Sequence, residues 1–540
     1  MKFNWHNPYL TTRTPLFARN AVATSHPLAA HAGNQALLNG GNAVDAAIAA
    51  AATLTIVEPV SNGLGSDAFA MVWDGQQLHG LNASGSAPSH WDTNWFARRY
   101  GVDAQGHARR PVRGWDSVTI PGAVAAWEAL HQRFGKLPFH QLLETAIDLA
   151  ERGVTIAPMV ARKWHAAVPL LQDQPGFAAT FMPNGRAPEI GEKFVMPAAA
   201  RTLRLLADQG ARAFYEGEAA EAIVRFAAQS DVPLTLADLA GYRPEWVTPV
   251  SRRYRGYDVH ELPPNGQGIA ALIALGILEH FDLASLPLDS VASQHLQVEA
   301  MKLAFADIYK YVGDPRSMDI TPEQMLDDSY LAERARLIDP ARASQPLSGM
   351  PASGGTVYLT TADESGMMVS FIQSNYMGFG SGVVVPEYGI SLQNRGAGFS
   401  SDPRSANVVA PGRRPFHTII PGFLTKDGQP QMSFGVMGGD MQPQGHVQTL
   451  VRMLDYQQQP QAACDAPRWK VNRDFSLDLE VGFHQGVAEQ LGQRGHRFTS
   501  LNDPYMDFGS GQFIWKLTTE GSDGYVIASD SRRDGQAVGF

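Results

Sequence analysis

A threonine lies where the sequence changes abruptly from loop to strand. Residues 340–355 are rich in proline and small side chains, which is typical of an exposed loop. From Thr356 the residues are β-branched and aromatic up to a turn at 363–366, and an apolar run over 367–372 completes the pattern of a hairpin. A hydroxyl at the first position of a buried strand, directly after a loop, is where an autoproteolytic hydrolase carries its nucleophile. The same local pattern also fits a linker followed by an ordinary hairpin.

Other familiar patterns of catalytic chemistry are missing from the sequence. It contains no GxSxG, no HExxH and no acidic calcium loop. The glycines at 63 and 65 lack the third glycine of a dinucleotide site and follow a predicted helix rather than a strand. The single cysteine, Cys464, excludes a disulfide framework and a cysteine-rich metal site, and it fits a small buried side chain. The sequence therefore predicts no metal and no cofactor.

The composition restricts the partners that the chain can have. Of 540 residues, 44% are hydrophobic and 18% are charged, which is the balance of a large globular protein. The net charge of −10, without a basic block, argues against nucleic acid or an anionic membrane as a partner. The first 20 residues have no apolar core of a secretory signal, and no stretch has the roughly 18 apolar residues of a membrane span. We expect a soluble cytoplasmic protein that acts on a small molecule.

The surrounding elements must hold the threonine in place. Residues 34–57 have a strong helical pattern that is broken at 40–42, and their alanines predict a helix that packs closely on a sheet. Strands are predicted over 68–73 and 253–262, and a long helix over 291–311. Strands and hairpins dominate after residue 356. This order predicts a layered enzyme of mixed α and β structure.

Many segments, in order along nearly the whole chain, resemble the gamma-glutamyltransferase family of N-terminal-nucleophile hydrolases. Each segment is short, and their number and order carry the resemblance. They are GGNAVDAA at 40–47, EP at 58–59, NGLG at 62–65, YRGY at 254–257, PP at 263–264, the helix over 299–307 with GDP at 313–315, Thr356, FGSG at 379–382, GIxLxN at 389–394, RP at 414–415, GG at 438–439, DAPR at 465–468 and ASDSR at 528–532.

The resemblance implies a fold and a maturation step. Such enzymes have a four-layer αββα fold with two stacked, mainly antiparallel sheets, and they cleave themselves before a threonine. Here the cut would fall between Gly355 and Thr356, giving a large fragment, 1–355, and a small fragment, 356–540, that stay together in one unit. The freed α-amine, with a reference pKa near 8, can act as the base for the threonine hydroxyl. A homodimer, or a heterotetramer of the two fragments, is a possible assembly.

The resemblance also implies the remaining catalytic groups. Ser374 aligns with the hydroxyl residue that bonds the nucleophile, and a buried serine that satisfies the backbone is the alternative. Gly438 and Gly439 follow a predicted strand, where adjacent glycines let backbone N–H groups approach an oxyanion. A glycine pair alone usually marks a turn, and only its order after Arg414 and Pro415 favours the catalytic role.

The sequence departs from this family where a glutamyl substrate would be held. The loop over 82–88 lacks the arginine that binds the α-carboxylate, Gly398 replaces the aspartate that receives the α-amine, and the paired serines before the glycines are His417 and Thr418. Arg395 stands where the family has a neutral amide, so it is a candidate for gripping a carboxylate, with a structural ion pair as the alternative.

Four further residues, Asn375, Tyr376, His417 and Thr418, are candidates for substrate binding. Asn375 and Tyr376 directly follow Ser374 and are expected to line the pocket, although a packed tyrosine is the alternative. His417 ranks below Arg395, because an isolated histidine among strands usually has a structural role.

The sequence therefore predicts an autoprocessed N-terminal-threonine amidohydrolase. We expect it to cleave a small amide that bears a carboxylate, as oxamate amidohydrolases or other acylases of this kind do. Hydrolysis or transfer of γ-glutamyl groups from glutathione-like substrates is the first alternative. An unprocessed, non-catalytic binding homologue is the second.

Overall fold

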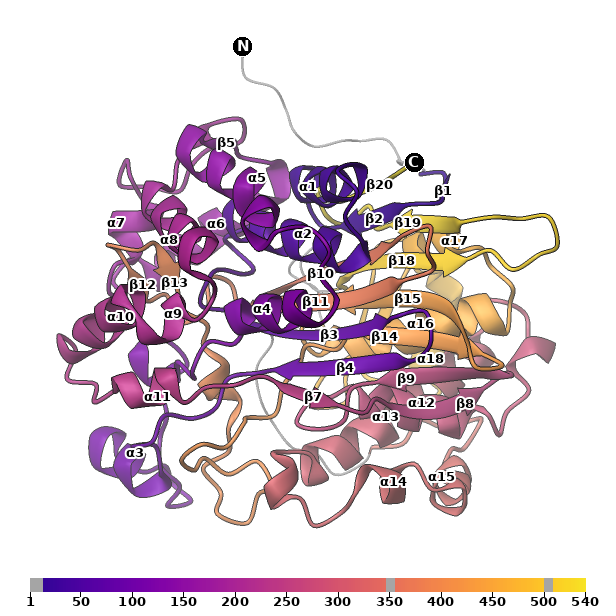
Figure 1. Ribbon diagram of the computed structural model, residues 1–540. Helices are drawn as coiled ribbons and strands as arrows, with labels where there is room; N and C mark the ends of the chain where they lie inside the picture. The colour runs from indigo at the N-terminus through magenta and orange to yellow at the C-terminus, as the bar shows by residue number, and fades with distance from the viewer. Residues whose placement is uncertain (1–12, 346–354, 500–507) are drawn as a thin grey trace.

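Two stacked sheets form the centre of the computed structural model, which describes residues 13–345, 355–499 and 508–540 (Figure 1). Each sheet has seven strands, and all their pairings are antiparallel. The first sheet has the order β1 (Leu16–Ala18), β19 (Tyr525–Ser529), β18 (Ser510–Lys516), β15 (Gln429–Met437), β14 (Gly422–Lys426), β9 (Tyr257–Glu261) and β8 (Val250–Tyr254). The second has the order β20 (Gln536–Gly539), β2 (Ala21–Thr24), β10 (Gly355–Ala362), β11 (Met368–Tyr376), β3 (Asp67–Trp73), β4 (Leu78–Ala83) and β7 (Glu245–Val247).

The two sheets approach each other closely at their centre. Apolar side chains from both inner faces form one buried cluster, including Phe69, Tyr358 and Phe423. Gly435 of β15 lies under the ring of Tyr358 of β10, where a Cβ would come within 2.4 Å of the ring. This contact fixes how β10 and β15 lie across from each other.

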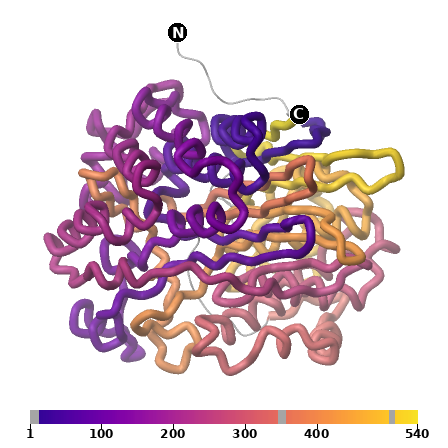
Figure 2. Tube along the Cα trace, viewed as in Figure 1, coloured from indigo at the N-terminus to yellow at the C-terminus, as the bar shows by residue number. Residues whose placement is uncertain are grey.

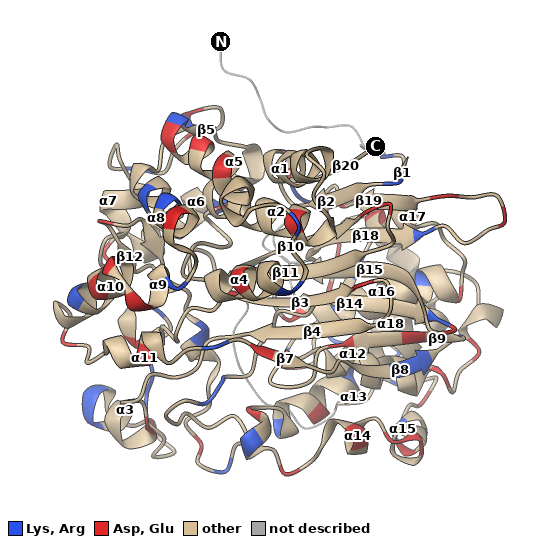
Figure 3. Cartoon of the chain, in the orientation of Figure 1, with Lys and Arg blue, Asp and Glu red and all other residues tan. Residues whose placement is uncertain are grey.

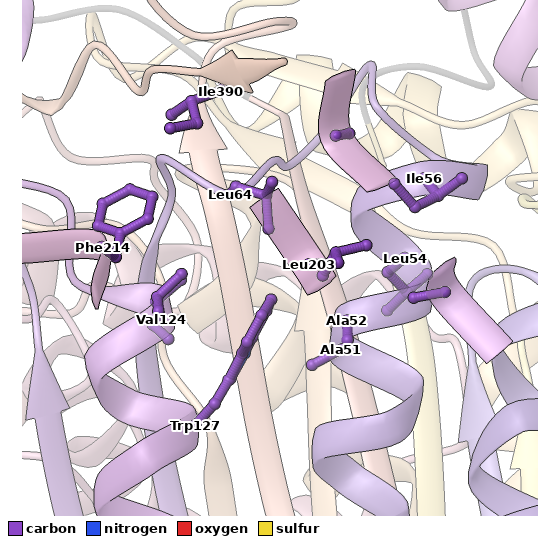
Figure 4. Packing of buried hydrophobic residues seen from close by; sticks show 14 of the residues in the cluster. Ala51, Ala52, Leu54, Ile56, Leu64, Val124, Trp127, Leu203, Phe214 and Ile390 are labelled. Atoms are coloured by element: carbon purple, nitrogen blue, oxygen red, sulfur yellow. The ribbon is translucent and has the colours of Figure 1, made fainter. Parts of the chain in front are cut away.

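Helices cover the outer face of the second sheet. They are α1 (Pro27–Leu38), α2 (Ala43–Val57), α4 (Ala123–Phe134), α5 (Phe139–Arg152) and α8 (Pro197–Gln209). All residues of α2 are buried, and its alanines allow close packing on β10 and β11. Asn42 begins α2 with a capping box to Asp45, as the predicted break at 40–42 requires. Figure 4 shows Trp127 of α4 in the same apolar layer as Ala51 and Ala52 of α2.

A second helical layer covers the other sheet and completes the αββα arrangement that the family resemblance implies. Its main members are α12 (Ile269–Leu278), α13 (Val291–Tyr311), α16 (Met441–Leu454) and α17 (Pro460–Asp465). All residues of α12 are buried, and α13 matches the predicted helix over 291–311.

Shorter elements lie around these layers. The helices are α3 (Thr93–Tyr100), α6 (Pro158–Leu171), α7 (Phe177–Phe181), α9 (Ala213–Glu216), α10 (Glu218–Ala228), α11 (Leu236–Ala240), α14 (Pro322–Met325), α15 (Asp328–Ala335) and α18 (Gln485–Gln493). The strands are β5 (Val154–Thr155), β6 (Lys193–Phe194), β12 (Val384–Val385), β13 (Ile390–Ser391), β16 (Trp469–Val471) and β17 (Leu477–Leu479). Single 3₁₀ turns are η1 (Trp115–Ser117), η2 (Leu283–Ser285), η3 (Pro315–Ser317) and η4 (Arg395–Gly398).

The prediction of one strand over 253–262 is wrong. The chain forms a hairpin there, with β8 and β9 joined by a turn at Arg255 and Gly256, which both have positive φ. Arg255 tolerates this conformation because its guanidinium binds Asp455 at 2.7 Å and Glu279 at 3.2 Å. Gly256 is the local sign of this turn, whereas the partners of Arg255 are remote in sequence.

The two predicted fragments are interwoven. In the second sheet, β10 and β11 of the later segment lie between β2 and β3 of the earlier one, as the alternating colours in Figure 2 show. In the first sheet, β14 of the later segment pairs with β9 of the earlier one. A cut before Thr356 would therefore leave both pieces held by shared sheets. Most of the predicted loop before it, 346–354, lies outside the described residues.

Charged residues of both signs are interspersed along the outer helices and loops (Figure 3). Within the described ranges, none of the helices combines the length and apolar character needed to cross a bilayer.

Candidate active site

Thr356 lies at one edge of the stacked sheets, where several strands begin or end. Thr360 Oγ1 lies 2.5 Å from Ser433 Oγ of the facing sheet, and Tyr358 faces Gly435. Extending this register by two residues places Thr356 across from the end of β15, directly before Gly438. The side chain is 3% exposed. The predicted nucleophile and the predicted oxyanion glycines are thus brought to the same edge.

Ser374 is the direct hydroxyl partner of Thr356. Its Oγ lies 3.2 Å from Thr356 Oγ1 and accepts the N–H of Tyr376 at 2.8 Å. Ser374 lies near the end of the fully buried strand β11, and its cross-strand neighbour is Asp67 at the start of β3. This arrangement allows Ser374 to orient the threonine hydroxyl.

Arg395 is a fully buried guanidinium within the same site. Its Nη2 donates to Ser374 Oγ at 3.3 Å and its Nη1 to Thr418 Oγ1 at 2.8 Å. Throughout the described ranges, its Nε has no acceptor and no carboxylate oxygen lies within 4 Å of its nitrogens. Burial lowers the pKa of Arg395 to about 10, so the group remains a cation at neutral pH.

Tyr376 forms one wall beside this cation. The guanidinium carbon of Arg395 lies 4.2 Å from the centre of the Tyr376 ring, which is a cation–π geometry. Tyr376 has a φ of 77°, in the left-handed region that a non-glycine residue seldom adopts. Such backbone strain clusters at functional sites.

Asn375 points its amide toward the neighbouring loops. Its Oδ1 accepts from Ser66 Oγ at 2.8 Å, and its Nδ2 donates to Ser391 Oγ at 3.2 Å. The residue is fully buried. These contacts support the loop beneath the site, and a contact of Asn375 with substrate stays a prediction.

His417 and Thr418 lie beside Arg395 from the segment that precedes β14. His417 Nε2 is 3.0 Å from Asp67 Oδ2, and its Nδ1 accepts the N–H of Ile419 at 3.4 Å. Burial holds the pKa of His417 well below its usual range, so the ring is neutral and donates from Nε2 to Asp67. Thr418 Oγ1 is an acceptor for Arg395. Direct substrate contact by either residue stays a prediction.

Gly438 and Gly439 connect β15 to α16. Their φ values, 125° and 60°, favour glycine, and a Cβ on Gly438 would come 2.9 Å from the Cα of Gly509. Gln267 Nε2 donates to Gly439 O at 2.9 Å and to Thr418 O at 2.7 Å, which ties the glycine turn to the segment that holds Arg395. The turn is therefore held rigidly, as an oxyanion hole requires.

Two acidic residues of the site escaped the sequence analysis. Asp67 follows the glycine loop at 63–65, which does not fit a dinucleotide site, and its partner His417 is 350 residues away. Asp440, directly after the glycine pair, is bound by Arg473, whose Nη2 lies 2.8 Å from Asp440 Oδ1. Neither position carries a local signal of its role, because both partners are brought in by the fold.

One group of possible metal ligands lies elsewhere in the described structure. Donor atoms of His295, Glu299 and His496 come within 4.8 Å of one another, and all three residues are buried. Lys302 Nζ lies 2.8 Å from Glu299 Oε1 and 3.3 Å from His496 Nδ1. The lysine ammonium already supplies the positive charge that balances Glu299, so this cluster is a hydrogen-bonded network around a lysine.

Comparison with known proteins gives consistent matches over the whole chain. The family model described as gamma-glutamyltranspeptidase matches residues 29–540. The glutathione hydrolase-like YwrD proenzyme of Bacillus subtilis is 36% identical, over 97% of this chain and 98% of that protein. The oxamate amidohydrolase proenzyme of Klebsiella pneumoniae is also 36% identical, over 96% of this chain and 98% of that protein. A crystal structure of cephalosporin acylase from Bacillus halodurans has a TM-score of 0.94 at 46% identity, and covers 100% of this chain and 99% of that chain.

Proposed function

Because this chain belongs to the gamma-glutamyltranspeptidase family and is an enzyme of that family, we propose that it is an autoprocessed amidohydrolase with Thr356 as its nucleophile. Its substrate is a small amide whose acyl group carries a carboxylate, such as oxamate. The observation that carries the choice of substrate is Arg395, a buried cation with an unpaired Nε and no carboxylate partner among the described residues.

A buried guanidinium without a carboxylate in direct contact favours an anionic ligand. Taking a charge out of water is costly unless hydrogen bonds and an opposite charge compensate it. Thr418 and Ser374 satisfy two N–H groups of Arg395 with neutral oxygens. A substrate carboxylate would supply an opposite charge in direct contact and an acceptor for the remaining donors.

Maturation would use the same hydroxyl as catalysis. Thr356 Oγ1 attacks the carbonyl carbon of Gly355, the peptide C–N bond breaks, and an ester joins the two pieces. Water then hydrolyses this ester, which leaves a carboxylate on Gly355 and an α-amine on Thr356. The amine is then the base for later turnovers.

Turnover makes and breaks the same kinds of bond, in the same order, on the substrate amide. The α-amine of Thr356 takes the proton of its own hydroxyl while Oγ1 attacks the substrate carbonyl, and the negative charge that forms on oxygen is received by the N–H groups of Gly438 and Gly439. The C–N bond breaks, and the leaving amine takes the proton back. Water hydrolyses the acyl ester, releases the acid and restores the hydroxyl. Ser374 holds Thr356 Oγ1 in place at 3.2 Å during both attacks.

The position of Arg395 favours a short acyl group. Two successive hydrogen bonds, of 3.3 and 3.2 Å, connect its Nη2 through Ser374 to Thr356 Oγ1. A carboxylate on Arg395 and a carbonyl at Thr356 therefore belong to one small molecule with few bonds between them. Oxamate, in which these groups are adjacent, and short dicarboxylic monoamides meet this condition.

Hydrolysis of γ-glutamyl amides is the second candidate. It is favoured by the similarity to the glutathione hydrolase-like proenzyme of Bacillus subtilis. The residues against it are Gly398, which offers no partner for an α-ammonium, and the loop over 82–88, which contains no arginine.

Denaturing electrophoresis tests the maturation step. We expect the purified protein to give two fragments that meet at Gly355 and Thr356, and Thr356→Ala to give one intact chain. Thr356→Ser, which keeps a hydroxyl, should still be cut. A wild-type protein that stays intact and has no amidase activity would refute the proposal.

An amide panel tests the substrate. Ammonia release should be faster from oxamate and from short dicarboxylic monoamides than from neutral amides of the same size. A γ-glutamyl anilide should be a poor substrate. Strong γ-glutamyl turnover with transfer to dipeptides would contradict the choice of substrate and favour the second candidate.

A further inference from the structure

A closed ring of contacts surrounds Arg395. Its guanidinium bonds Ser374 on one side and Thr418 on the other. Thr418 is the neighbour of His417, and His417 bonds Asp67. Asp67 is in turn the cross-strand partner of Ser374. The pair of His417 and Asp67 therefore connects the two acceptors that hold the guanidinium.

Asp67 is the acidic member of this ring and is fully buried. Its Oδ2 accepts from the neutral His417 ring at 3.0 Å, so the histidine gives it a hydrogen bond but no positive charge. Arg395 is not in ion-pair contact with it, yet the two charges attract each other across the ring. Each is a buried charge without a direct opposite partner among the contacts of the ring.

We propose that Asp67 is the internal counter-charge of Arg395, and that it takes up a proton when a substrate carboxylate binds there. This inference rests on the proposed role of Arg395 as the carboxylate site. In the free enzyme the ionised Asp67 balances the arginine. A bound carboxylate replaces it as the counter-charge, and the protonated acid still accepts the hydrogen bond from His417.

The charges around Asp67 determine whether binding takes up or releases a proton. Burial raises the pKa of Asp67 to about 7 in the free protein. A second negative charge on Arg395 disfavours the ionised acid further and raises this pKa, so binding takes up a proton above about pH 7. Affinity for the carboxylate therefore falls as pH rises through the range between the free and the bound pKa.

The other groups that face Asp67 do not titrate in this range. Arg414 adds a fixed positive charge and is itself paired with Glu245 at 2.6 Å. Burial keeps the pKa of His417 well below the window, and it keeps those of the two nearest phenols, Tyr215 and Tyr242, above it. Two further groups lie near Arg395: the α-amine that cleavage gives Thr356, with a reference pKa near 8, and Asp440, whose pKa is raised by burial. The difference in proton uptake between the wild type and Asp67→Asn therefore measures the part that belongs to Asp67.

Calorimetric titration with malonate tests the inference on the mature enzyme. The apparent binding enthalpy, measured at pH 7.5 in two buffers of different ionisation enthalpy, gives the number of protons taken up. We expect a measurable uptake for the wild type and a roughly tenfold weaker affinity at pH 8.5 than at pH 6.5, one pKa unit of coupling being a factor of ten. Asp67→Asn keeps the acceptor for His417, and should bind malonate with less proton uptake and a flatter pH profile than the wild type.

A matched control is available in the other sheet. Glu261 and His446 form a second buried carboxylate–histidine pair at 2.6 Å that does not contact Arg395. Glu261→Gln should keep the proton uptake on malonate binding.

Arg395→Met distinguishes a failure of the proposed carboxylate site from a failure of the proposed role of Asp67. If this variant binds malonate as the wild type does, the proposed carboxylate site is wrong. If it loses malonate while Asp67→Asn takes up as many protons as the wild type, the counter-charge is not Asp67 and the inference fails. Should Asp67→Asn not fold, the wild type alone decides, because binding without proton uptake overturns the inference.

Discussion

Replacing Arg395 by methionine separates a role in substrate binding from a role in holding Ser374. Methionine is similar in length and apolar, so it fills a buried site without leaving an unpaired charge. The variant loses the cation for a substrate carboxylate and also the donor to Ser374 Oγ at 3.3 Å. Loss of the cation affects substrates that carry a carboxylate, whereas loss of the donor to Ser374 affects every substrate, so the two effects can be measured separately.

The expected size of the effect follows from the burial of the group. Removing one member of a buried, hydrogen-bonded charge pair costs about 3–5 kcal/mol, because the other charge is left without a partner. For oxamate, this corresponds to a loss of roughly 150- to 5000-fold in kcat/KM. The carboxylate is not the reacting group, so most of the loss should appear in KM rather than in kcat.

Oxamide, in which a neutral amide replaces the carboxylate, gives the comparison. Ammonia release from both substrates is measured with the wild type and with Arg395→Met, and oxamide should lose less than about tenfold. Arg113→Met is the matched control, because Arg113 is also a largely buried guanidinium but donates to the carbonyl of Gly378 at 2.8 Å. Equal losses on oxamate and oxamide would refute the carboxylate role and leave Arg395 as a support for Ser374.

Three further outcomes are expected. Ser374→Ala should lower kcat by roughly 10- to 100-fold with little change in KM, since the nucleophile loses its 3.2 Å hydroxyl partner, and steady-state kinetics with an unchanged kcat would contradict this role. Gly438→Ala should lower kcat by at least tenfold and also lower Tm, because a Cβ there comes 2.9 Å from the Cα of Gly509. Gly40 is the control: its φ is 87° and the space around it is open, so Gly40→Ala tests the conformational cost alone. Burial lowers the pKa of His260 to about 4, so between about pH 6.5 and 4 the unfolded chain binds a proton at this residue and the folded protein does not. The free energy of unfolding should therefore fall over this range as the pH is lowered, by roughly 3 kcal/mol from this residue. Denaturant unfolding of His260→Gln should show a smaller fall.

The layered fold could be predicted because its elements have strong local signals. The break at 40–42, the alanine-rich helix after it and the long helix over 291–311 follow from capping residues and periodicity, and the structure has them at those positions. The hairpin at Arg255 was missed, because its turn depends on Glu279 and Asp455 rather than on the turn residues alone.

Only part of the candidate site could be predicted from the sequence. Thr356, Ser374 and the glycine pair belong to strand ends, so a resemblance in chain order is enough to indicate them. The contacts of Arg395 depend on which strands pair and how the sheets face each other. Asp67 reaches the site only because β3 pairs with β11 in a register that places it opposite Ser374. No pattern within a few residues of Asp67 contains that information.

The packing around Gly398 leaves little room for an acidic side chain at this position. A Cβ on Gly398 would come 2.9 Å from the carbonyl oxygen of Phe416, so an aspartate side chain has no room there unless that backbone moves. The backbone of Phe416 is held in turn, because its N–H donates to Asn407 Oδ1 at 2.8 Å, while Asn407 Nδ2 donates to Gly398 O at 2.6 Å. The turn that carries Arg395 and the segment that carries His417 are thus locked together without space for an acidic group. Position 398 therefore offers no acidic side chain to a substrate α-ammonium, and this favours the proposed short acyl group with one carboxylate over a glutamyl group.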